Sequence, residues 1–531
     1  MIDVRSVNNA AFSYTDLLEY VDFFRLDARR KQDRERQVAL GQFFTPAPVA
    51  RLMASMVECT SASINILDAG AGVGSLFAAC VAMLCQREKR PEKISVTAYE
   101  IDESLIEYLQ TTLRLCELAC ERVGIEFVGA IHQKDFLLAG VEMLQNTLFS
   151  DVSDKPSFNC AILNPPYRKI QTKSEARKLL QTVGIEASNL YAGFLALSMR
   201  LLEPSGEIVA ITPRSFCNGP YFRDFRKDFL HTLSLRRLHV FESRMEAFND
   251  DAVLQENIIF HAIKEQEKPE KVCISSSIDL FDETPPVHVV PYERIVHPDD
   301  PQSFIRIVQN QGDEKVVQHM SAFHISLDDL GITVSTGKVV DFRAIEFLRT
   351  KLEEGTIPLL FPTHVRYGAI TWPKPEGKKP SALLDTMQTK ALQIPNEHYV
   401  LVKRFSAKEE KKRIVAAVYD PTSIPASHVG FENRLNYFHC NGRGLDPTLA
   451  KGLALYLNST LVDTYFRQFN GHTQVNATDL RNIKYPTMQQ LEALADRAQS
   501  AFPEQADLDY IVREELLAMQ EDESAIPPHS F

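Results

Sequence analysis

Between residues 64 and 264 the chain alternates short apolar runs with longer segments whose apolar residues recur every three or four positions. A short apolar run between turn residues is typical of a buried strand, and a period near 3.6 residues is typical of a helix. Their regular alternation predicts an α/β fold, with a mostly parallel sheet covered by helices. The predicted strands cover residues 64–67, 94–99, 161–163, 207–211 and 258–262, and the predicted helices residues 76–85, 105–120 and 191–202.

The segments on either side of this region have different patterns. Residues 12–40 predict a helix that ends in a charged run, and Thr45 with Pro46 predicts the N-terminal cap of a helix reaching residue 57. Residues 265–275 are polar and contain proline, as in a linker, and the pattern after them is less regular, with β-like runs at 399–402 and 414–419. We therefore predict an N-terminal helical segment (1–40), a catalytic domain (41–265) and a mixed α/β domain (270–531).

Composition narrows the class of protein. The chain has 531 residues, 44% of them hydrophobic and 24% charged, as expected for globular domains with large cores. It has no apolar run long enough to span a bilayer and no signal-like N-terminal pattern, so we expect a cytoplasmic protein with no membrane partner. The nine cysteines form no Cys-x-x-Cys pair and no zinc-ligand spacing, so we expect no metal site.

Net charge is −12, which by itself argues against nucleic-acid binding, because DNA affinity comes largely from cationic contacts to phosphate. The charge is segregated along the chain, however. Residues 338–413 contain 15 Lys and Arg against 9 Asp and Glu, a surplus of six positive charges, whereas the C-terminal tail is acidic. A local basic surface is therefore compatible with the acidic total.

A glycine-rich turn follows the first predicted strand. Residues 64–74 read Ile-Asn-Ile-Leu-Asp-Ala-Gly-Ala-Gly-Val-Gly, where Gly70 and Gly72 allow tight turning and close approach to a ligand. The spacing differs from the Gly-x-Gly-x-x-Gly pattern that holds a pyrophosphate. Asp68, just before the glycines, would repel a phosphate but could attract the cationic amino-acid part of S-adenosylmethionine (SAM).

Two more acidic residues lie at strand ends: Glu100 follows the strand predicted at residues 94–99, and Asp135 lies at the end of a further strand before residue 161. Glu100 could accept hydrogen bonds from both ribose hydroxyls of a nucleoside. Asp135 could accept from an adenine amino group, with Phe136 against the ring face. Three acids in order, each at a strand end, predict a nucleoside cofactor.

The strand predicted at residues 161–163 runs into Asn164, Pro165, Pro166 and Tyr167. Two prolines make this loop rigid. An amino group conjugated to an aromatic ring is a poor nucleophile, and two acceptors around it would draw it toward tetrahedral geometry. The Asn164 side-chain oxygen and the Pro165 carbonyl could be those acceptors, held in place by the rigid loop. Tyr167 offers a π-face to a base flipped out of a duplex.

Taken in order, residues 41–46, 68–74, 100, 135–136 and 164–167 resemble the gamma-class N6-adenine DNA methyltransferases of type II restriction–modification systems. The resemblance implies a Rossmann-like SAM-dependent methyltransferase domain with a mostly parallel seven-stranded sheet. It gives Thr45 a role in holding the methionine part of SAM. It relates residues 206–213 to a later strand-and-loop motif and makes Phe248 the candidate aromatic residue against the flipped base. The implied partners are double-stranded DNA and a cognate restriction endonuclease, and we expect a monomer.

In the C-terminal half, residues 335–343 and 471–480 resemble segments of target-recognition domains of such enzymes. We expect phosphate contacts from the basic residues of this half, with Lys338, Lys403 and Arg404 as substrate-binding candidates. A basic run continues beyond them and includes Lys408, Lys411, Lys412 and Arg413.

Several alternatives stay open at this point. An N4-cytosine target has the same conjugated amino group, and an Asn-Pro-Pro-Tyr loop also serves enzymes that methylate a protein glutamine or ribosomal RNA. Such enzymes usually have much shorter chains without a long C-terminal domain. A nuclease fused to a methylase lacks support, because Glu410 with Lys411 and Lys412 has no convincing partner acid. A non-catalytic DNA-binding protein would leave the loop at Asn164 unexplained.

Overall fold

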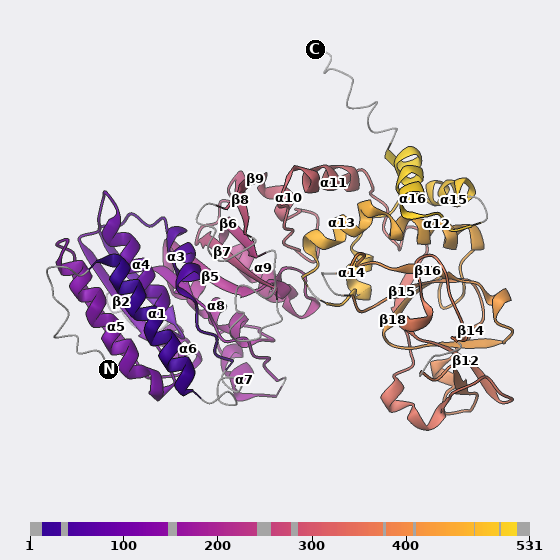
Figure 1. Cartoon of the computed structure of the whole chain (residues 1–531), viewed down its shortest axis with the longest axis horizontal. Coiled ribbons are helices and arrows are strands. Elements are labelled where there is room, and N and C mark those ends of the chain that lie inside the picture. Colours follow the sequence, from indigo (N-terminus) through magenta and orange to yellow (C-terminus); the bar gives the residue numbers. More distant parts are fainter. Residues whose placement is uncertain are drawn as a thin grey trace, which may run out of the picture. The chain divides into compact units, whose positions relative to one another are not determined.

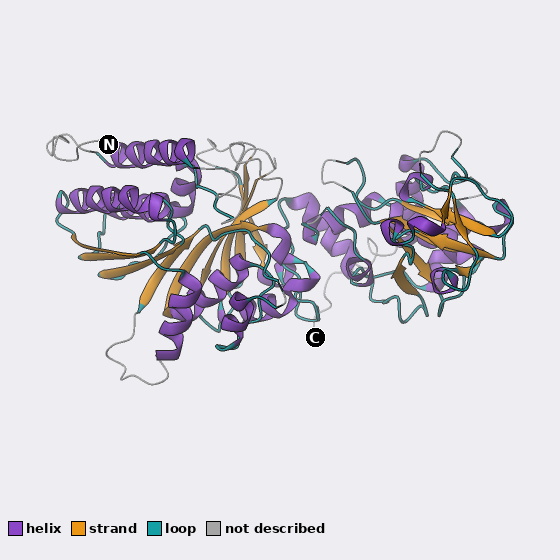
Figure 2. Cartoon of the chain, turned by 90° about the horizontal axis from the view of Figure 1, so that it is seen from below, coloured by secondary structure: helices purple, strands orange, loops and turns teal. Residues whose placement is uncertain are grey.

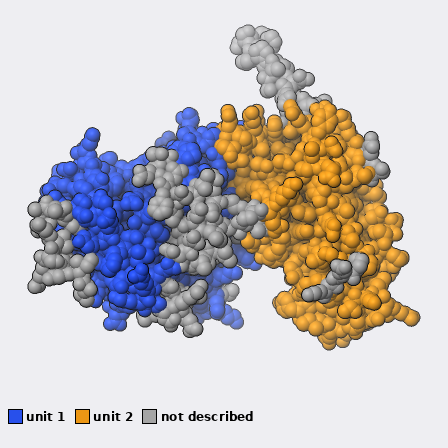
Figure 3. All heavy atoms as spheres, in the orientation of Figure 1, with its two compact units in different colours: residues 1–309 blue, residues 310–531 orange. Residues whose placement is uncertain are grey.

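The computed structural model describes residues 13–32, 41–146, 157–171, 173–241, 256–277, 285–374, 379–406, 410–471, 473–498 and 501–517. The chain divides into two compact units, residues 1–309 and 310–531 (Figure 3). Among the described helices, none combines the length and the apolar character that crossing a membrane requires.

Unit 1 is built on one sheet with the strand order β3-β2-β1-β4-β5-β7-β6-β8-β9 (Figure 1). β3, β2, β1, β4 and β5 run parallel to one another, and β7 is antiparallel to both of its neighbours. The strands are β1 (Ser63–Ala69), β2 (Lys93–Tyr99), β3 (Glu126–His132), β4 (Phe158–Leu163), β5 (Leu202–Pro213), β6 (Ser234–Phe241), β7 (Asn257–Ile263), β8 (Lys271–Ser277) and β9 (Val287–Pro291). The predicted α/β fold is confirmed, with all five predicted strands present.

Helices cover both faces of this sheet (Figure 2). One group packs together on one face and comprises α1 (Tyr14–Lys31), α3 (Ala47–Ser55), α4 (Ser75–Gln86) and α5 (Glu103–Glu121). A second group comprises α6 (Phe136–Asn146), α7 (Glu175–Gln181), α8 (Leu190–Leu201) and α9 (Arg223–Thr232). Central strands buried on both faces are apolar along their whole length, as in β4, where all six residues are buried.

The strand order places a switch point between β1 and β4. From β1 the chain proceeds outward through β2 and β3, and it then returns to β4 on the other side of β1. The loops that leave neighbouring strands at such a point diverge, and ligands of open α/β sheets bind in the resulting crevice at the carboxyl ends of the strands. The loops after Ala69 and Leu163 both begin there.

Three predictions about unit 1 need correction. The sheet has nine strands in the described residues, because β8 pairs with β6 and β9 with β8. For the same reason the first unit extends to residue 309, and the predicted linker at 265–275 is part of the sheet region. Helix α1 ends at Lys31, where Gln32 is extended; residues 33–40 lie outside the described residues.

The cap of α3 also differs from the prediction. Pro46 is the N-cap residue of α3 and makes no side-chain cap bond, but Asp22 Oδ1 from α1 accepts from the Ala47 N–H at 3.2 Å. The Thr45 side chain bonds elsewhere, as described below.

Unit 2 contains two smaller sheets among helices, with strand orders β10-β18-β15-β16 and β11-β13-β12-β17-β14. The strands are β10 (Thr333–Thr336), β11 (Leu348–Arg349), β12 (Thr356–Leu360), β13 (Ala382–Leu384), β14 (Ile394–Pro395), β15 (Tyr399–Lys403), β16 (Ala416–Tyr419), β17 (His428–Phe431) and β18 (Leu435–His439). The short α10 (Tyr292–Ile295) belongs to unit 1, and the helices of unit 2 are α11 (Gln311–Ser321), α12 (Pro447–Asn458), α13 (Thr460–Phe469), α14 (Ala477–Arg481), α15 (Met488–Arg497) and α16 (Gln505–Val512). The two segments singled out in the sequence meet here, because α14 packs against β10.

Gly74, which ends the glycine-rich turn and caps α4, offers a test of this packing. Its φ is +90°, and an added Cβ would lie 2.6 Å from the Phe77 ring and 2.9 Å from the Thr112 side chain. We expect Gly74→Ala to lower the free energy of unfolding by about 2–4 kcal/mol, from backbone strain plus overpacking. The matched control is Gly124→Ala, where φ is +76° but a Cβ meets open space, so only about 1 kcal/mol of strain is expected. Thermal unfolding of the two variants would contradict this account if their midpoints fell equally.

Candidate active site

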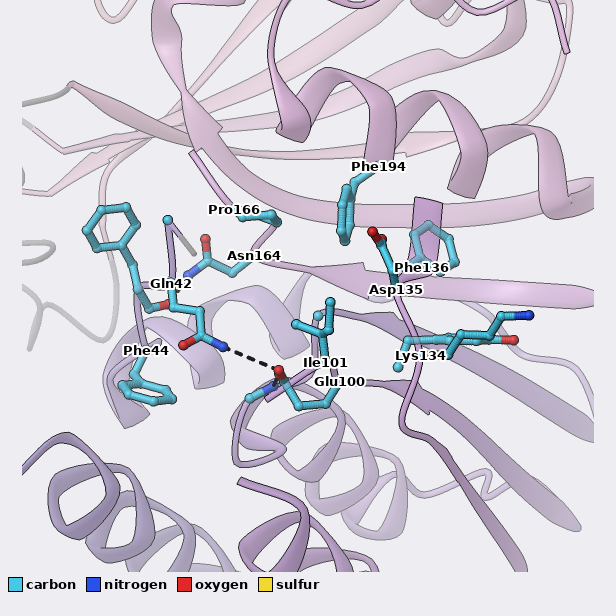
Figure 4. A pocket seen from close by; sticks show the side chains of 15 residues that line it. Gln42, Phe44, Glu100, Ile101, Lys134, Asp135, Phe136, Asn164, Pro166 and Phe194 are labelled. Atoms are coloured by element: carbon cyan, nitrogen blue, oxygen red, sulfur yellow. Dashed lines mark hydrogen bonds between the residues drawn. The ribbon is translucent and has the colours of Figure 1, made fainter. Parts of the chain in front are cut away.

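A cavity with an empty volume of about 610 Å³ lies at the carboxyl ends of the first four strands (Figure 4). Five segments of the chain line it: the 41–44 segment, the glycine-rich turn, and the loops after β2, β3 and β4. One helical side chain, Phe194 of α8, completes the wall. The lining residues are Gly41, Gln42, Phe43, Phe44, Gly70, Gly72, Tyr99, Glu100, Ile101, Lys134, Asp135, Phe136, Asn164, Pro166 and Phe194.

The Asn164 amide has a defined orientation. Its Nδ2 donates to the Phe43 carbonyl at 2.9 Å and to Thr45 Oγ1 at 3.0 Å. A carbonyl can only accept, so the NH2 end must face Phe43 and the amide cannot be turned over. Oδ1 therefore points the other way, where it is buried and has no hydrogen-bond partner among the described residues. The site presents a fixed, desolvated acceptor.

Hydrogen bonds also hold Tyr167, the last residue of this loop. The Tyr167 backbone N–H donates to the Gly41 carbonyl, and its hydroxyl donates to the Ile211 carbonyl of β5, both at 3.3 Å. Burial raises the pKa of Tyr167 well above its usual value, so the hydroxyl keeps its proton. The Tyr167 ring lies 5.3 Å from the Phe43 ring. Pro166 lines the cavity, whereas Pro165 and Tyr167 are not lining residues.

The glycine-rich turn is fixed by the strand beside it. The N–H groups of Gly70 and Ala71 both donate to the Tyr99 carbonyl at 2.9 Å. Gly72 has a φ of +59°, and an added Cβ would touch the Phe44 ring at 3.4 Å. Gly70 and Gly72 thus bring backbone without a side chain to the cavity wall.

Glu100 is buried at the bottom of the cavity. Its Oε2 accepts from the Gly72 N–H at 2.8 Å, and its Oε1 accepts from the Asp102 N–H at 2.8 Å and from Gln42 Nε2 at 3.3 Å. Burial raises the pKa of Glu100, and the two backbone N–H groups act against that rise. Each carboxylate oxygen has room for further donors.

Asp135 and Phe136 lie at the opposite end of the cavity from Asn164 (Figure 4). Asp135 Oδ1 accepts from the Leu137 N–H at 2.8 Å, at the start of α6. The Phe136 ring packs between those of Tyr99 and Phe194, each 5.3 Å away. An acidic side chain beside an aromatic wall suits the polar edge and the face of a purine.

Two predicted cofactor residues are not part of the cavity wall. Thr45 is buried, and its hydroxyl accepts a hydrogen bond from the Asn164 side chain in the loop after β4. Asp68 is fully buried within β1, and neither oxygen has a hydrogen-bond partner among the described residues. Burial raises the pKa of Asp68 to about 8; the Phe77 N–H acts against this rise, and the nearby Glu100 adds to it.

The substrate-binding residues predicted for the C-terminal half have mixed surroundings. Lys338 is exposed and Lys403 is half-buried. Arg404 is half-buried, and its guanidinium donates to the Asn433 carbonyl at 3.2 Å and to Gln474 Oε1 at 3.4 Å.

The basic run after Arg404 is only partly a surface feature. Arg413 was grouped with the phosphate contacts in error, because it is 1% exposed and donates to Asn470 Oδ1 at 2.8 Å inside unit 2. Lys411 is exposed and Lys412 half-buried. Phe248 and Lys408 lie outside the described residues.

Sequence reasoning missed several lining residues. Gln42 and Phe44 belong to a segment that it recognised but used only through Thr45. Ile101 directly follows Glu100 and is 52% exposed; an apolar residue after a strand-end acid was the available signal. No signal in the sequence pointed to Phe194, because one aromatic residue on an apolar helix looks like any core residue.

Comparisons with known proteins agree with this geometry. The family described as Eco57I restriction-modification methylase matches residues 85–248. The type II methyltransferase M.PstI of Providencia stuartii is 47% identical over 499 residues, 94% of this chain and 97% of that protein. The chain belongs to the type II methyltransferases. The relative M.BsuBI of Bacillus subtilis is 45% identical over 89% of this chain and 92% of its own.

A solved structure shows the same fold. The match to the type IIL restriction-modification enzyme MmeI, solved in complex with DNA, covers 98% of this chain and 76% of the MmeI chain. The two are 11% identical, and the TM-score is 0.53. The predicted α/β methyltransferase fold is thus confirmed, as is the predicted relation to restriction–modification methylases.

Asp68 generates a prediction about pH. With a folded-state pKa of about 8 and an unfolded value near 3.9, the folded protein holds an extra proton between these pH values, so stability falls as pH rises through that window. The amide of Asp68→Asn does not ionise, so the variant should not lose stability over this pH range. We expect the variant's thermal midpoint to exceed the parent's by little at pH 5 and by clearly more at pH 9, measured without ligand. A difference that stayed the same at both pH values would contradict the assignment.

Proposed function

We propose that this type II methyltransferase transfers the methyl group of SAM to N6 of an adenine flipped out of duplex DNA. The proposal rests most directly on Asn164 Oδ1, a buried acceptor without a partner whose orientation is fixed by Phe43 and Thr45. An unpartnered buried oxygen is costly and calls for an explanation. A donor on the substrate provides one.

The chemistry requires such an acceptor. The lone pair of an exocyclic amino group is delocalised into its ring, and hydrogen bonds from its two N–H groups to two acceptors favour pyramidal nitrogen. Asn164 Oδ1 and the Pro165 carbonyl would be the two acceptors. The acceptor groups do not have to reorganise during the reaction, since the amide is already oriented and the prolines fix the backbone.

The cavity residues fit the predicted cofactor. Glu100 would accept from the ribose hydroxyls, Asp135 from the adenine amino group, and Phe136 would pack against the adenine ring. Asp68 would act through the methionine ammonium group, which would supply the partner that its buried carboxyl lacks. When bound, SAM supplies a methyl group on an electrophilic sulfonium.

The target amino group in duplex DNA is reached only by extrusion of its base. We assign the stacking face for this base to Tyr167, whose hydroxyl donates to the Ile211 carbonyl and whose ring packs against Phe43. Unit 2 would be the target-recognition domain. Methylation would protect host DNA from a cognate endonuclease that cleaves the same site.

The decisive experiment incubates the protein with SAM labelled in its methyl group and with plasmid DNA, followed by digestion to nucleosides. We expect the label in N6-methyladenine. Label in N4-methylcytosine would refute the choice of base, and label in RNA or protein of a mixed extract but not in DNA would refute the substrate class. Sequencing of the methylated plasmid then gives the recognition site.

Asn164 and Thr45 allow a graded test of the mechanism. Asn164→Ala should lower kcat by at least about a hundredfold while SAM still binds, because an acceptor that acts in the transition state is lost. Thr45→Val removes one acceptor of the Asn164 amide and should lower kcat by about tenfold with KM for SAM unchanged. Thr45→Ser keeps the hydroxyl and should restore most of the rate.

A control at the other end of the cavity separates chemistry from cofactor binding. Asp135→Ala should weaken SAM binding in calorimetry. Near-normal turnover in Asn164→Ala, or a loss of SAM affinity in Thr45→Val as large as in Asp135→Ala, would overturn these roles.

A further inference from the structure

Unit 2 exposes two large apolar side chains close together on the segment of residues 338–345. Phe342 is 67% exposed and Ile345 is 68% exposed. Fully burying side chains of this size gains about 2 kcal/mol each, so their exposure leaves that energy available to a binding partner.

The segment is rigid at both ends. Val339 and Ala344 are buried in one hydrophobic cluster, on either side of a 3₁₀ turn, Asp341–Arg343. Gly337 lets the chain pass directly over its neighbour, since an added Cβ would lie 2.2 Å from the Glu432 carbonyl oxygen. Phe342 is thus presented to solvent by a fixed turn.

An ion-pair network ties this turn to the next one. Arg434 pairs with Asp341 and, at 2.8 Å, with the fully buried Glu432. Lys379 approaches the same Asp341 carboxylate at 3.6 Å. The two cations of this network, Arg434 and Lys379, therefore balance its two acids, Asp341 and Glu432. Within residues 338–346, the exposed charges outside the network are Lys338, Arg343 and Glu346, which leave one positive charge in excess.

The remaining charges of the turn surround the apolar side chains. Lys338 and Arg343 are exposed, and the Arg343 guanidinium lies 5.6 Å above the Phe342 ring. Arg404 and Phe405 form a second pair of a cation above an aromatic ring, with the guanidinium 5.9 Å from the ring. The Phe405 side chain is 45% exposed. This pair is joined to the network because the Arg404 N–H donates to the Arg434 carbonyl at 2.9 Å. We call Lys338, Phe342, Arg343, Ile345 and Phe405 the basic–aromatic patch.

We infer that the basic–aromatic patch is a DNA-binding surface, on which Lys338 and Arg343 contact phosphates and Phe342 contacts the bases as an apolar wedge. The inference deepens the proposed function and depends on it. Cationic side chains around isolated apolar ones suit a polyanion with apolar base steps. A partner protein would be better matched by a continuous apolar face with few charges at its centre.

The test uses the full-length protein, with fluorescence anisotropy on a labelled fragment of plasmid DNA at several salt concentrations. Phe342→Ala should weaken binding about tenfold and leave the salt dependence unchanged, because an apolar contact releases no counterions. Lys338→Ala and Arg343→Ala should each weaken the salt dependence, so that the negative slope of log K against log salt becomes shallower by about one. The matched controls are Tyr510→Ala and Lys315→Ala, an exposed aromatic residue and an exposed lysine elsewhere in unit 2; they should bind DNA like the parent.

Kinetics separate this inference from the proposed function. Phe342→Ala should raise KM for DNA while kcat at saturating DNA, SAM affinity and the methylated nucleoside stay as in the parent. DNA binding by Phe342→Ala equal to that of Tyr510→Ala would overturn the patch even if adenine methylation is observed. A loss of self-association in sedimentation, with DNA affinity unchanged, would overturn it in favour of a protein contact.

Discussion

The site depends on the one-way orientation of the Asn164 amide. The Phe43 carbonyl and the Thr45 hydroxyl take both bonds of Nδ2, so Oδ1 can only face the other way. These two partners come from a segment about 120 residues earlier in the chain. The sheet, its loops and helix α3 must therefore all be in place before the acceptor exists. Local preferences of the Asn-Pro-Pro-Tyr loop could not produce it alone.

The strand order explains how distant segments meet. β1 and β4 are neighbours, and the chain leaves them toward opposite sides of the sheet, so the loops after Ala69 and Leu163 open a crevice between them. The Gly41 carbonyl then holds the Tyr167 N–H, which joins the 41–46 segment to the loop after β4. Glu100 joins the same segment to the glycine-rich turn through Gln42 and Gly72. The part of the cavity around Glu100 and the part around Asn164 are thus joined by one set of hydrogen bonds.

The parts that could be predicted from sequence are those governed by local chain geometry. Gly70, Gly72, Glu100, Asp135 and Asn164 each follow a short apolar run, and a residue directly after a parallel strand falls at the binding edge whatever the rest of the chain does. The hydrogen bond between Asn164 and Thr45 and the place of Phe194 in the cavity wall could not be predicted, since both depend on long-range contacts that no local pattern encodes. The unit boundary was placed too early because β8 and β9 add to the sheet after a polar, proline-containing stretch that resembled a linker.

Two buried acceptors without partners, Asn164 Oδ1 and the Asp68 carboxyl, have a further consequence. Each such group costs roughly 1–3 kcal/mol, a sizeable part of the 5–15 kcal/mol by which most domains are stable. The large apolar core around β1 and α4 can offset that cost. A cofactor ammonium at Asp68 and a substrate amino group at Asn164 would each satisfy an acceptor that the folded chain leaves unpaired. Ligand binding would then recover free energy already spent in folding, because the site is organised for its ligands before they arrive.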